Sequence, residues 1–264
     1  MPQEPPINSG PAQPVRAQTG VVTLLFTDIV SSTALKQRLG DIAGAALIQQ
    51  QRALVRQLLA TFLGAEEIET AGDSFLLSFP KPSDAVRFAL VLQGRLRGLN
   101  QDQPVPLEDR VGIQLGEVVI EQHEAGHKPK DLYGLQIDTC ARVMSLAKGG
   151  QVLMSRGVFD KARQVLKGED IEGVGALEWL NHGPYLLKGI EEPVEICEVR
   201  EAGGEALSSP TSSEKAQRQV RADEEPVLGW RPAIGQVVSE EVSRQCSGER
   251  YHAIESSEES SELV

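Results

Sequence analysis

Hydrophobic and polar positions change in blocks along the chain, and the first blocks predict one strand followed by two helices. The β-branched run Val21–Phe26 predicts a buried strand that stops at Thr27-Asp28. Hydrophobic residues then recur at three- and four-residue spacing from Leu35 to Phe62, with a break at Gly40-Asp41. This spacing predicts two helices, the second of them capped by Asp41.

The same rules assign the rest of a dense segment that runs from residue 21 to residue 200. They predict a β-hairpin (strands 67–69 and 74–79 around Ala71-Gly72-Asp73), a helix near 85–92, a strand at 111–121, a helix at 137–146, a strand at 151–155, a helix at 158–166, and closing strands at 178–180 and 185–199. The order βααββαβ with antiparallel hairpins favours an α+β domain in which helices pack on one face of a mixed sheet.

The two ends of the chain differ from this segment in composition. Residues 1–20 contain five prolines, and residues 201–264 are rich in Ser and Glu. Such sequences bury too little apolar surface to offset the entropy of ordering. We therefore expect a disordered arm at 1–20, a folded domain at 21–200 and a disordered acidic tail at 201–264.

Charge and composition exclude several classes of protein. The chain is 40% hydrophobic and 24% charged, with a net charge of −12. The acidic balance argues against binding to nucleic acid, whose phosphates need a positive field. No apolar run approaches the roughly 18 residues of a membrane span, and the proline-rich start does not resemble a secretory signal. We expect a cytoplasmic protein with no membrane partner.

Its three cysteines form no zinc or disulfide pattern, and its four histidines have no ligand spacing.

Candidate chemistry begins where the first strand ends. Asp28 precedes Ile29-Val30-Ser31-Ser32-Thr33, a short turn that leads into a helix, and amides at a helix N-terminus favour phosphate. A plainer alternative is that Asp28 or Ser32 only caps this helix. Asp73 lies at the tip of the predicted hairpin, where an ordinary turn residue is the alternative. If the hairpin lies beside the first strand, Asp28 and Asp73 project from one edge of the sheet and suit Mg²⁺.

These residues resemble a family, the class III nucleotidyl cyclases, in their adenylate and guanylate cyclase catalytic domain. The matching segments, which occur in the family's order, are Leu25-Phe26-Thr27-Asp28-Ile29-Val30-Ser31-Ser32-Thr33, Glu69-Thr70-Ala71-Gly72-Asp73-Ser74-Phe75, Asp131-Leu132-Tyr133-Gly134 with Ala141-Arg142, and Leu187-Lys188-Gly189. The resemblance covers about two-thirds of the chain and implies a ferredoxin-like cyclase fold.

The resemblance also implies the roles of individual residues. Asp28 and Asp73, with Ile29, are the metal positions for two Mg²⁺ or Mn²⁺ per site. Val30, Ser31, Ser32 and Thr33 are the triphosphate cradle, and Lys188 grips the triphosphate. Arg142 stabilises charge on the α-phosphoryl group in the transition state, because a guanidinium stays charged and donates two hydrogen bonds. An ordinary surface ion pair is the alternative for Arg142.

The chain departs from the family's usual residues in three ways. Glu69 and Asp131 take the positions that face the purine, and they mix a guanylate-type with an adenylate-type residue, so ATP and GTP both stay open as substrates. Asp138 stands where the family usually has Asn to orient the ribose. Ser31 stands where Gly is common.

The resemblance thus implies an intracellular signalling enzyme that converts ATP or GTP to the 3′,5′-cyclic monophosphate and pyrophosphate. It implies a homodimer in which each site draws residues from both protomers. The alternative, motivated by Asp138 and the mixed purine pair, is a weak or inactive cyclase-like module that binds nucleotide or dimerises to regulate a partner. Leu228-Gly229-Trp230-Arg231-Pro232 faintly resembles a connector to a serine/threonine kinase domain, which would imply a kinase-type signalling context.

Overall fold

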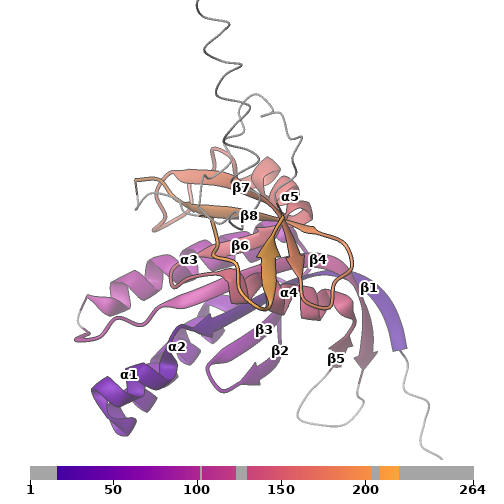
Figure 1. The fold of residues 1–264 in the computed structure, drawn as a ribbon. Helices are drawn as coiled ribbons and strands as arrows, with labels where there is room; N and C mark the ends of the chain where they lie inside the picture. The colour runs from indigo at the N-terminus through magenta and orange to yellow at the C-terminus, as the bar shows by residue number, and fades with distance from the viewer. Residues whose placement is uncertain (1–16, 102, 123–129, 204–208, 220–264) are drawn as a thin grey trace, which may run out of the picture.

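The computed structural model describes residues 17–101, 103–122, 130–203 and 209–219, and it orders them as β1-α1-α2-β2-β3-α3-β4 followed by β5-α4-β6-α5-β7-β8-β9 (Figure 1). The bounds of these elements are β1 Ala17–Ile29, α1 Ser32–Leu39, α2 Asp41–Leu59, β2 Glu66–Ala71, β3 Ser74–Phe79, α3 Pro82–Asn100, β4 Asp109–Gln122, β5 Lys130–Tyr133, α4 Leu135–Leu146, β6 Val152–Ser155, α5 Arg156–Leu166, β7 Leu177–Leu187, β8 Val194–Glu201 and β9 Ala216–Arg218. The first seven elements confirm the predicted βααββαβ order.

The strands form one mixed sheet. Its order is β2-β3-β1-β4-β6-β8-β7-β9, and β5 pairs with the last residues of β4. The pair β4–β6 is parallel and the other pairs among the described residues are antiparallel. This arrangement confirms the α+β class with a mixed sheet.

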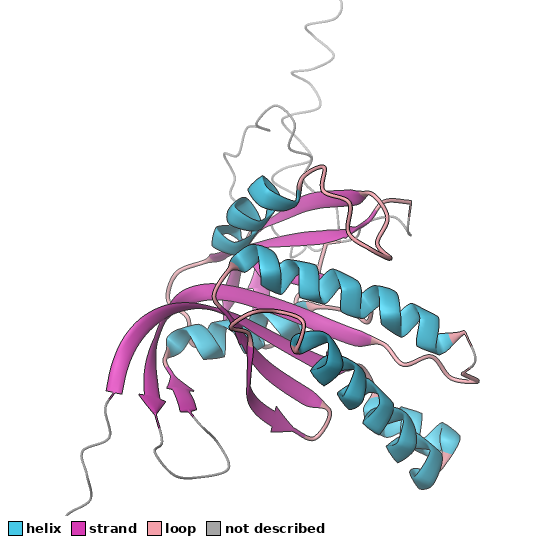
Figure 2. Ribbon diagram, turned by 180° about the vertical axis from the view of Figure 1, so that it is seen from behind, coloured by secondary structure: helices cyan, strands magenta, loops and turns pink. Residues whose placement is uncertain are grey.

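Helices cover both faces of the sheet, so the prediction that they pack on one face is wrong. Leu25 of β1 belongs to the large core cluster with residues of α2, α3 and α5, whereas its neighbour Leu24 packs in a separate cluster with Cys140 of α4. Successive strand residues point to opposite faces, so α4 lies across the sheet from α2, α3 and α5. Figure 2 shows α2, α3 and α5 in front of the sheet and α4 behind it. The sequence pattern predicts a helix but not the face it covers.

The end of the sheet that carries β5 curls toward β2. Lys130 of β5 forms an ion pair with Glu66 of β2, although these strands are not paired with each other. Ile68 of β2 and Leu132 of β5 lie in the same buried cluster under α4. The curl therefore brings the short strand β5, which was not predicted, beside the β2–β3 hairpin.

Two predicted boundaries differ from the structure, one at the end of β1 and one at the start of α2. Strand pairing extends beyond the apolar run in the first case. β1 continues to Ile29 because it pairs with β4 from Ala17↔Glu121 to Ile29↔Asp109. Asp28 therefore lies within the strand and not after it. Asp41 is the first residue of α2, whose N-cap residue is Gly40, so the predicted cap is wrong.

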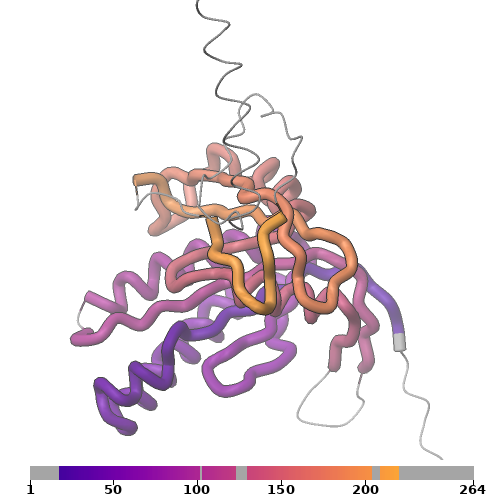
Figure 3. Tube along the Cα trace, viewed as in Figure 1, coloured from indigo at the N-terminus to yellow at the C-terminus, as the bar shows by residue number. Residues whose placement is uncertain are grey.

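Parts of the predicted disordered ends are ordered. Residues 17–20 belong to β1, and β9 pairs with β7 and buries Ala216, which is 1% exposed; Figure 3 traces this return of the chain. Composition misses both segments because backbone pairing, which depends little on side-chain type, holds them. The rest of the predicted arm and tail, including residues 228–232, lies outside the described residues.

Among the described helices, none is long and apolar enough to cross a bilayer.

Candidate active site

The two predicted metal carboxylates lie at neighbouring strand ends. β1 pairs with β3 as far as Thr27↔Phe75, so the next residues, Asp28 and Ser74, are adjacent, and Asp73 follows at the hairpin tip. Asp73 is partly buried, and its Oδ2 is buried without a hydrogen-bond partner among the described residues. The strand register thus supports the predicted placement of both carboxylates at one edge of the sheet.

Helix α2 holds the hairpin that carries Asp73. The Arg52 guanidinium donates to the carbonyl of Gly72 at the hairpin tip. One turn further along α2, Arg56 donates to both carboxylate oxygens of Glu67, each at 2.8 Å, and Thr70 donates to Glu67 at 2.6 Å. The carboxylate of Asp73 takes no part in these bonds, so the tip is positioned without it.

Arg110, which the sequence did not single out, contacts the first metal carboxylate. Arg110 is the β4 residue opposite Asp28, and its Nη2 and Nε donate to Asp28 Oδ2 at 2.5 and 3.1 Å. The Asp28 side chain is 17% exposed and that of Arg110 is 30% exposed. The pair fixes the Asp28 side chain and leaves its Oδ1 outside the ion pair.

A third carboxylate, Asp109, lies buried behind this edge. Gln51 and Thr27 donate to its Oδ2 at 2.8 and 3.1 Å, and its Oδ1 has no partner among the described residues. Burial raises the pKa of Asp109 from 3.8 to about 6, the two hydrogen bonds lower it, and the charges of Asp28 and Asp73 raise it further. Folding therefore favours the protonated form of Asp109.

We expect Asp109→Asn to remove a pH-dependent part of the stability. A carboxyl whose pKa rises from 3.8 to about 6 on folding stabilises the native state below pH 4 and loses that contribution as pH rises to 6. The free energy of unfolding of the wild type, relative to the variant, should fall by about 3 kcal/mol across this window and stay level above it. Urea denaturation at pH 4, 5, 6 and 7 measures the difference, and a difference independent of pH would contradict the prediction.

The predicted phosphate cradle is the tight connection between β1 and α1. The amide of Val30 donates to the carbonyl of Glu108 at 2.8 Å, and Ser31 then takes a left-handed conformation with φ of 57°. Ser31 is the N-cap residue and makes no side-chain cap bond, so neither Asp28 nor Ser32 caps this helix. A left-handed conformation suits glycine and is strained for serine. The connection leaves the first amides of α1, from Ser32 and Thr33 onward, without helical partners.

Ile29 could serve a metal only through its backbone. Its side chain is 3% exposed and lies in the main core cluster.

The two purine-facing candidates lie on the strands that the sheet's curl brings together. Glu69 is exposed on β2, and Asp131 is partly buried on β5 opposite Glu121. The ion pair between Lys130 and Glu66 joins their two strands. Both residues take part in interactions within the described structure.

Asp138 and Arg142 lie one turn apart on α4, which packs tightly on the sheet. A Cβ on Gly112 of β4 would lie 2.2 Å from the backbone nitrogen of Met144, so only glycine allows this approach. Asp138 is exposed. The Nε of Arg142 is buried and has no partner among the described residues. Cys140, which lies between them in the sequence, is buried in the core, and its thiol donates to the carbonyls of Leu24 and Gly112. Burial raises the pKa of this thiol to about 12, as is expected of a packing residue.

Lys188 lies far along the sheet from the metal carboxylates. It is exposed and occupies the turn after β7, not the strand predicted for it. Strands β4, β6 and β8 separate β7 from β1. The structure therefore brings Asp28 and Asp73 together but does not bring Lys188 to them within one chain.

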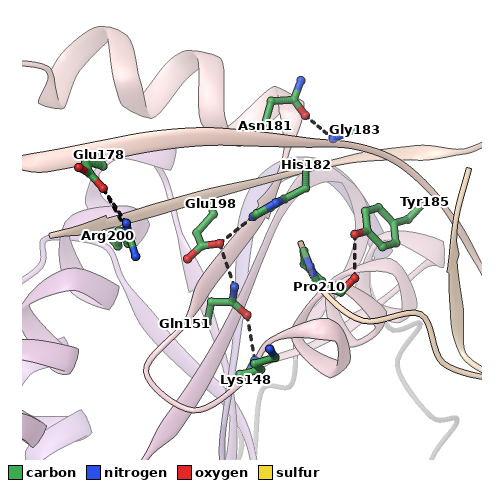
Figure 4. Close-up of polar contacts among 10 residues, drawn as sticks. All are labelled: Lys148, Gln151, Glu178, Asn181, His182, Gly183, Tyr185, Glu198, Arg200 and Pro210. Carbon is green, nitrogen blue, oxygen red and sulfur yellow. Dashed lines mark hydrogen bonds and ion pairs between the residues drawn. The ribbon is translucent and has the colours of Figure 1, made fainter. Parts of the chain in front are cut away.

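A buried polar network holds the loop that follows α4 (Figure 4). His182 and Glu198, both buried, are joined at 2.7 Å between Nε2 and Oε2, and Gln151 donates to the same Glu198 oxygen at 2.8 Å. The amide of Lys148 donates to Gln151 Oε1 at 3.0 Å. This network links β7 and β8 to the end of α4 and so supports the helix that carries Arg142.

Sequence comparison decides the family. The model of the adenylate and guanylate cyclase catalytic domain matches residues 15–192. This chain belongs to that family. Among its relatives, the receptor-type adenylate cyclase GRESAG 4.3 of Trypanosoma brucei brucei is 31% identical over 233 residues, which cover 75% of this chain and 18% of that protein. The cyclase chain thus spans less than a fifth of the length of that relative.

Solved structures agree with the family. An adenylate cyclase from Trypanosoma brucei in its monomeric state is 28% identical with a TM-score of 0.58, and the match covers 71% of this chain and 93% of that one. The adenylyl cyclase CyaB from P. aeruginosa has a TM-score of 0.61 at 20% identity, with 71% and 97% covered, and supports the fold. The predicted fold and family are confirmed.

Sequence reasoning missed three residues near the metal carboxylates of this cyclase domain: Arg52, Asp109 and Arg110. Glu108-Asp109-Arg110 looks like a polar run before a strand, and Arg52 looks like a surface residue of an amphipathic helix. Only pairing between β1 and β4 and the packing of α2 reveal their contacts. Among the described residues, no cluster of three or more His, Cys, Asp or Glu side chains could hold a metal, so Asp28 and Asp73 stand as a pair.

Proposed function

We propose that this cyclase domain converts ATP or GTP to the 3′,5′-cyclic monophosphate and pyrophosphate by a two-metal mechanism. The observation that carries the proposal is the register of β1 and β3, which sets Asp28 beside the hairpin tip that bears Asp73. The match of the family's model to residues 15–192 supports the same reaction.

The residues present fit two divalent cations. Asp73 has a buried carboxylate oxygen with no protein partner in the described structure, and Asp28 keeps one oxygen outside its pair with Arg110. Oxygen ligands of this kind suit Mg²⁺ or Mn²⁺. When bound, two such cations would activate the ribose 3′-hydroxyl and offset the charge of the polyphosphate. The pair with Arg110 holds the Asp28 side chain in place before any cation binds.

The other residues bind and orient the nucleotide. The amide of Val30 is already bonded to Glu108, so the amides of Ser32 and Thr33 at the start of α1 donate to phosphate oxygens. Lys188 adds a positive charge at the triphosphate. Arg142 donates to the α-phosphoryl oxygens as charge develops there. Its Nε has no hydrogen-bond partner among the described residues.

We propose a homodimer because one chain separates the residues of one site. Asp131 lies opposite Glu121, which pairs with Ala17, so Asp131 is level with the end of β1 remote from Asp28. Lys188 lies beyond three further strands. Tyr133 and Leu135, next to Asp131, are 50% and 54% exposed, a degree of apolar exposure that a second copy would cover. Two symmetric sites at the interface would reunite the separated groups.

Product analysis tests the proposal and the choice of base. The purified chain is incubated with ATP, GTP, CTP or UTP, each with Mg²⁺ or Mn²⁺, and cyclic products are separated by chromatography. We expect a 3′,5′-cyclic purine nucleotide from ATP, GTP or both. No cyclic product from any nucleotide, in a chain shown to be folded and dimeric, would overturn the proposed activity. The cytoplasmic location stays a prediction.

We expect Asp138→Asn to raise kcat. Asp138 is exposed on the face of α4 that also carries Arg142, so its charge repels a polyphosphate and its carboxylate cannot donate to the ribose. The amide removes the charge at nearly constant volume and supplies a donor to the ribose. One added hydrogen bond of about 1.4 kcal/mol in the transition state gives a gain of about ten-fold in kcat. Initial rates with Mg²⁺ measure it. A fall in kcat with unchanged folding would show that the aspartate has a role of its own.

A further inference from the structure

Residues 209–219, which lie beyond the segment that matches the family, fold back onto the end of β7. β9 pairs with β7 from Tyr185↔Arg218 to Leu187↔Ala216. The Tyr185 hydroxyl donates to the carbonyl of Pro210 at 2.9 Å (Figure 4), and the amide of Gln219 donates to the carbonyl of Pro184 at 2.9 Å. The segment is therefore held to β7 by backbone and side-chain bonds along its length.

The same segment packs against the helix that carries Arg142. Ala216 is 1% exposed and shares a buried cluster with Leu187 of β7 and Val143 of α4. Its apolar contacts give it a fixed place beside both the turn after β7 and α4. It is thus part of the half of the domain that holds Arg142 and Lys188.

This packing sets two lysines side by side. The amide of Lys188 donates to the carbonyl of Lys215 at 2.8 Å, which joins the turn after β7 to the turn before β9. Both side chains are exposed. Within the described ranges, neither lysine forms an ion pair, and the neighbouring Glu214 pairs with neither of them.

Two exposed lysines on neighbouring turns, joined by a backbone hydrogen bond, suit a multiply charged anion, because one such anion can contact both ammonium groups. Each lysine is a flexible four-carbon stem with a point charge, so both can reach phosphate groups of one polyphosphate.

We propose that Lys215 binds the triphosphate of the substrate together with Lys188, so that a segment outside the family's matched region supplies a substrate-binding residue. This inference rests on the proposed function, in which Lys188 contacts the triphosphate. It also gives residues 209–219 a role in the reaction: they carry Lys215 and, through the backbone bond, hold Lys188.

The test compares Lys215→Gln with Lys188→Gln in the full chain. Lys161→Gln, on the exposed side of α5, is the matched control because it removes the same charge elsewhere. Kinetics give KM for the nucleotide and kcat, and calorimetry gives the affinity for inorganic pyrophosphate without turnover. We expect Lys215→Gln to raise KM and weaken pyrophosphate binding by about three- to ten-fold, with little change in kcat. Lys215→Arg should retain both values, and the control should change neither.

The outcomes separate this inference from the function on which it rests. If Lys188→Gln raises KM and weakens pyrophosphate binding but Lys215→Gln does neither, the role of Lys215 is refuted and the proposed function stands. If neither variant changes KM or pyrophosphate binding while cyclic product still forms, the assignment of the triphosphate to this turn is wrong, and the inference falls with it. Thermal unfolding of each variant checks that the fold is unchanged. We expect the same unfolding temperature as the wild type, because both lysines are exposed turn residues.

Discussion

Asp73→Asn is expected to lower turnover on the order of 10³-fold or more while the domain stays folded. An amide has the shape of the carboxylate but lacks the negative charge that a hard divalent cation needs. The fold should be unaffected because Arg52 and Arg56 hold the hairpin without using the Asp73 carboxylate. Asp28→Asn should be equally inactive, since the register places both carboxylates at one edge. Initial rates at saturating nucleotide with Mg²⁺ and with Mn²⁺ measure the loss.

Binding of Mn²⁺ distinguishes a metal role from a structural one. Calorimetric or spin-resonance titration should show weaker binding to Asp73→Asn than to the wild type, with the same unfolding temperature. Asp170→Asn, an exposed aspartate in the loop after α5, is the control and should behave as wild type. Turnover near the wild-type rate in either metal variant would show that the two-metal assignment is wrong.

Mixing two inactive variants is expected to restore activity. In a symmetric dimer, Asp73→Ala disables the metal half and Arg142→Ala the transition-state half of each site. A heterodimer of the two then has one site with both defects and one site with neither. With equal mixing and random pairing, half of the dimers are heterodimers, so about a quarter of the wild-type activity should return. Rates are measured for each variant alone and after they are mixed and re-equilibrated.

Heterodimer formation needs its own measurement, because unmixed homodimers would also be inactive. Two affinity tags, one on each variant, allow heterodimers to be isolated in sequence before the assay. Mixing Asp73→Ala with Asp28→Ala is the control: both changes lie in the metal half, so no site in any dimer is intact. Isolated heterodimers of the first pair that remain inactive would exclude sites shared between protomers.

Local patterns predicted the elements of this fold well where packing and pairing agree with them. The break at Gly40-Asp41 separates α1 from α2, and the tip Gly72-Asp73 joins β2 to β3. Patterns failed where pairing with a distant strand orders a segment that has few apolar residues. β9 is such a segment, since backbone bonds to β7 and one buried alanine hold it within a Ser- and Glu-rich sequence.

The candidate site divides in the same way. Asp28, Asp73 and Arg142 were predicted from motifs whose order along the chain is specific, and their roles stay predictions. Asp109 and Arg110 were not, because their chemistry arises from contacts made across the sheet. Arg110 reaches Asp28 only because β1 and β4 pair in one register, and Asp109 is buried only because α2 covers it with Gln51.

What the sequence by itself determined is therefore the kind of protein: an α+β cyclase domain, its first seven elements and the residues of its motifs. These follow from short-range periodicity and from residue identities at set spacings, which the chain carries whatever its packing. The tertiary structure decided which groups meet. It set α4 on the face opposite the other helices, paired Asp28 with Arg110, and placed Lys215 beside Lys188. Contacts of this kind depend on strand register and on the burial of groups that are 27 to 82 residues apart, and no local pattern encodes them.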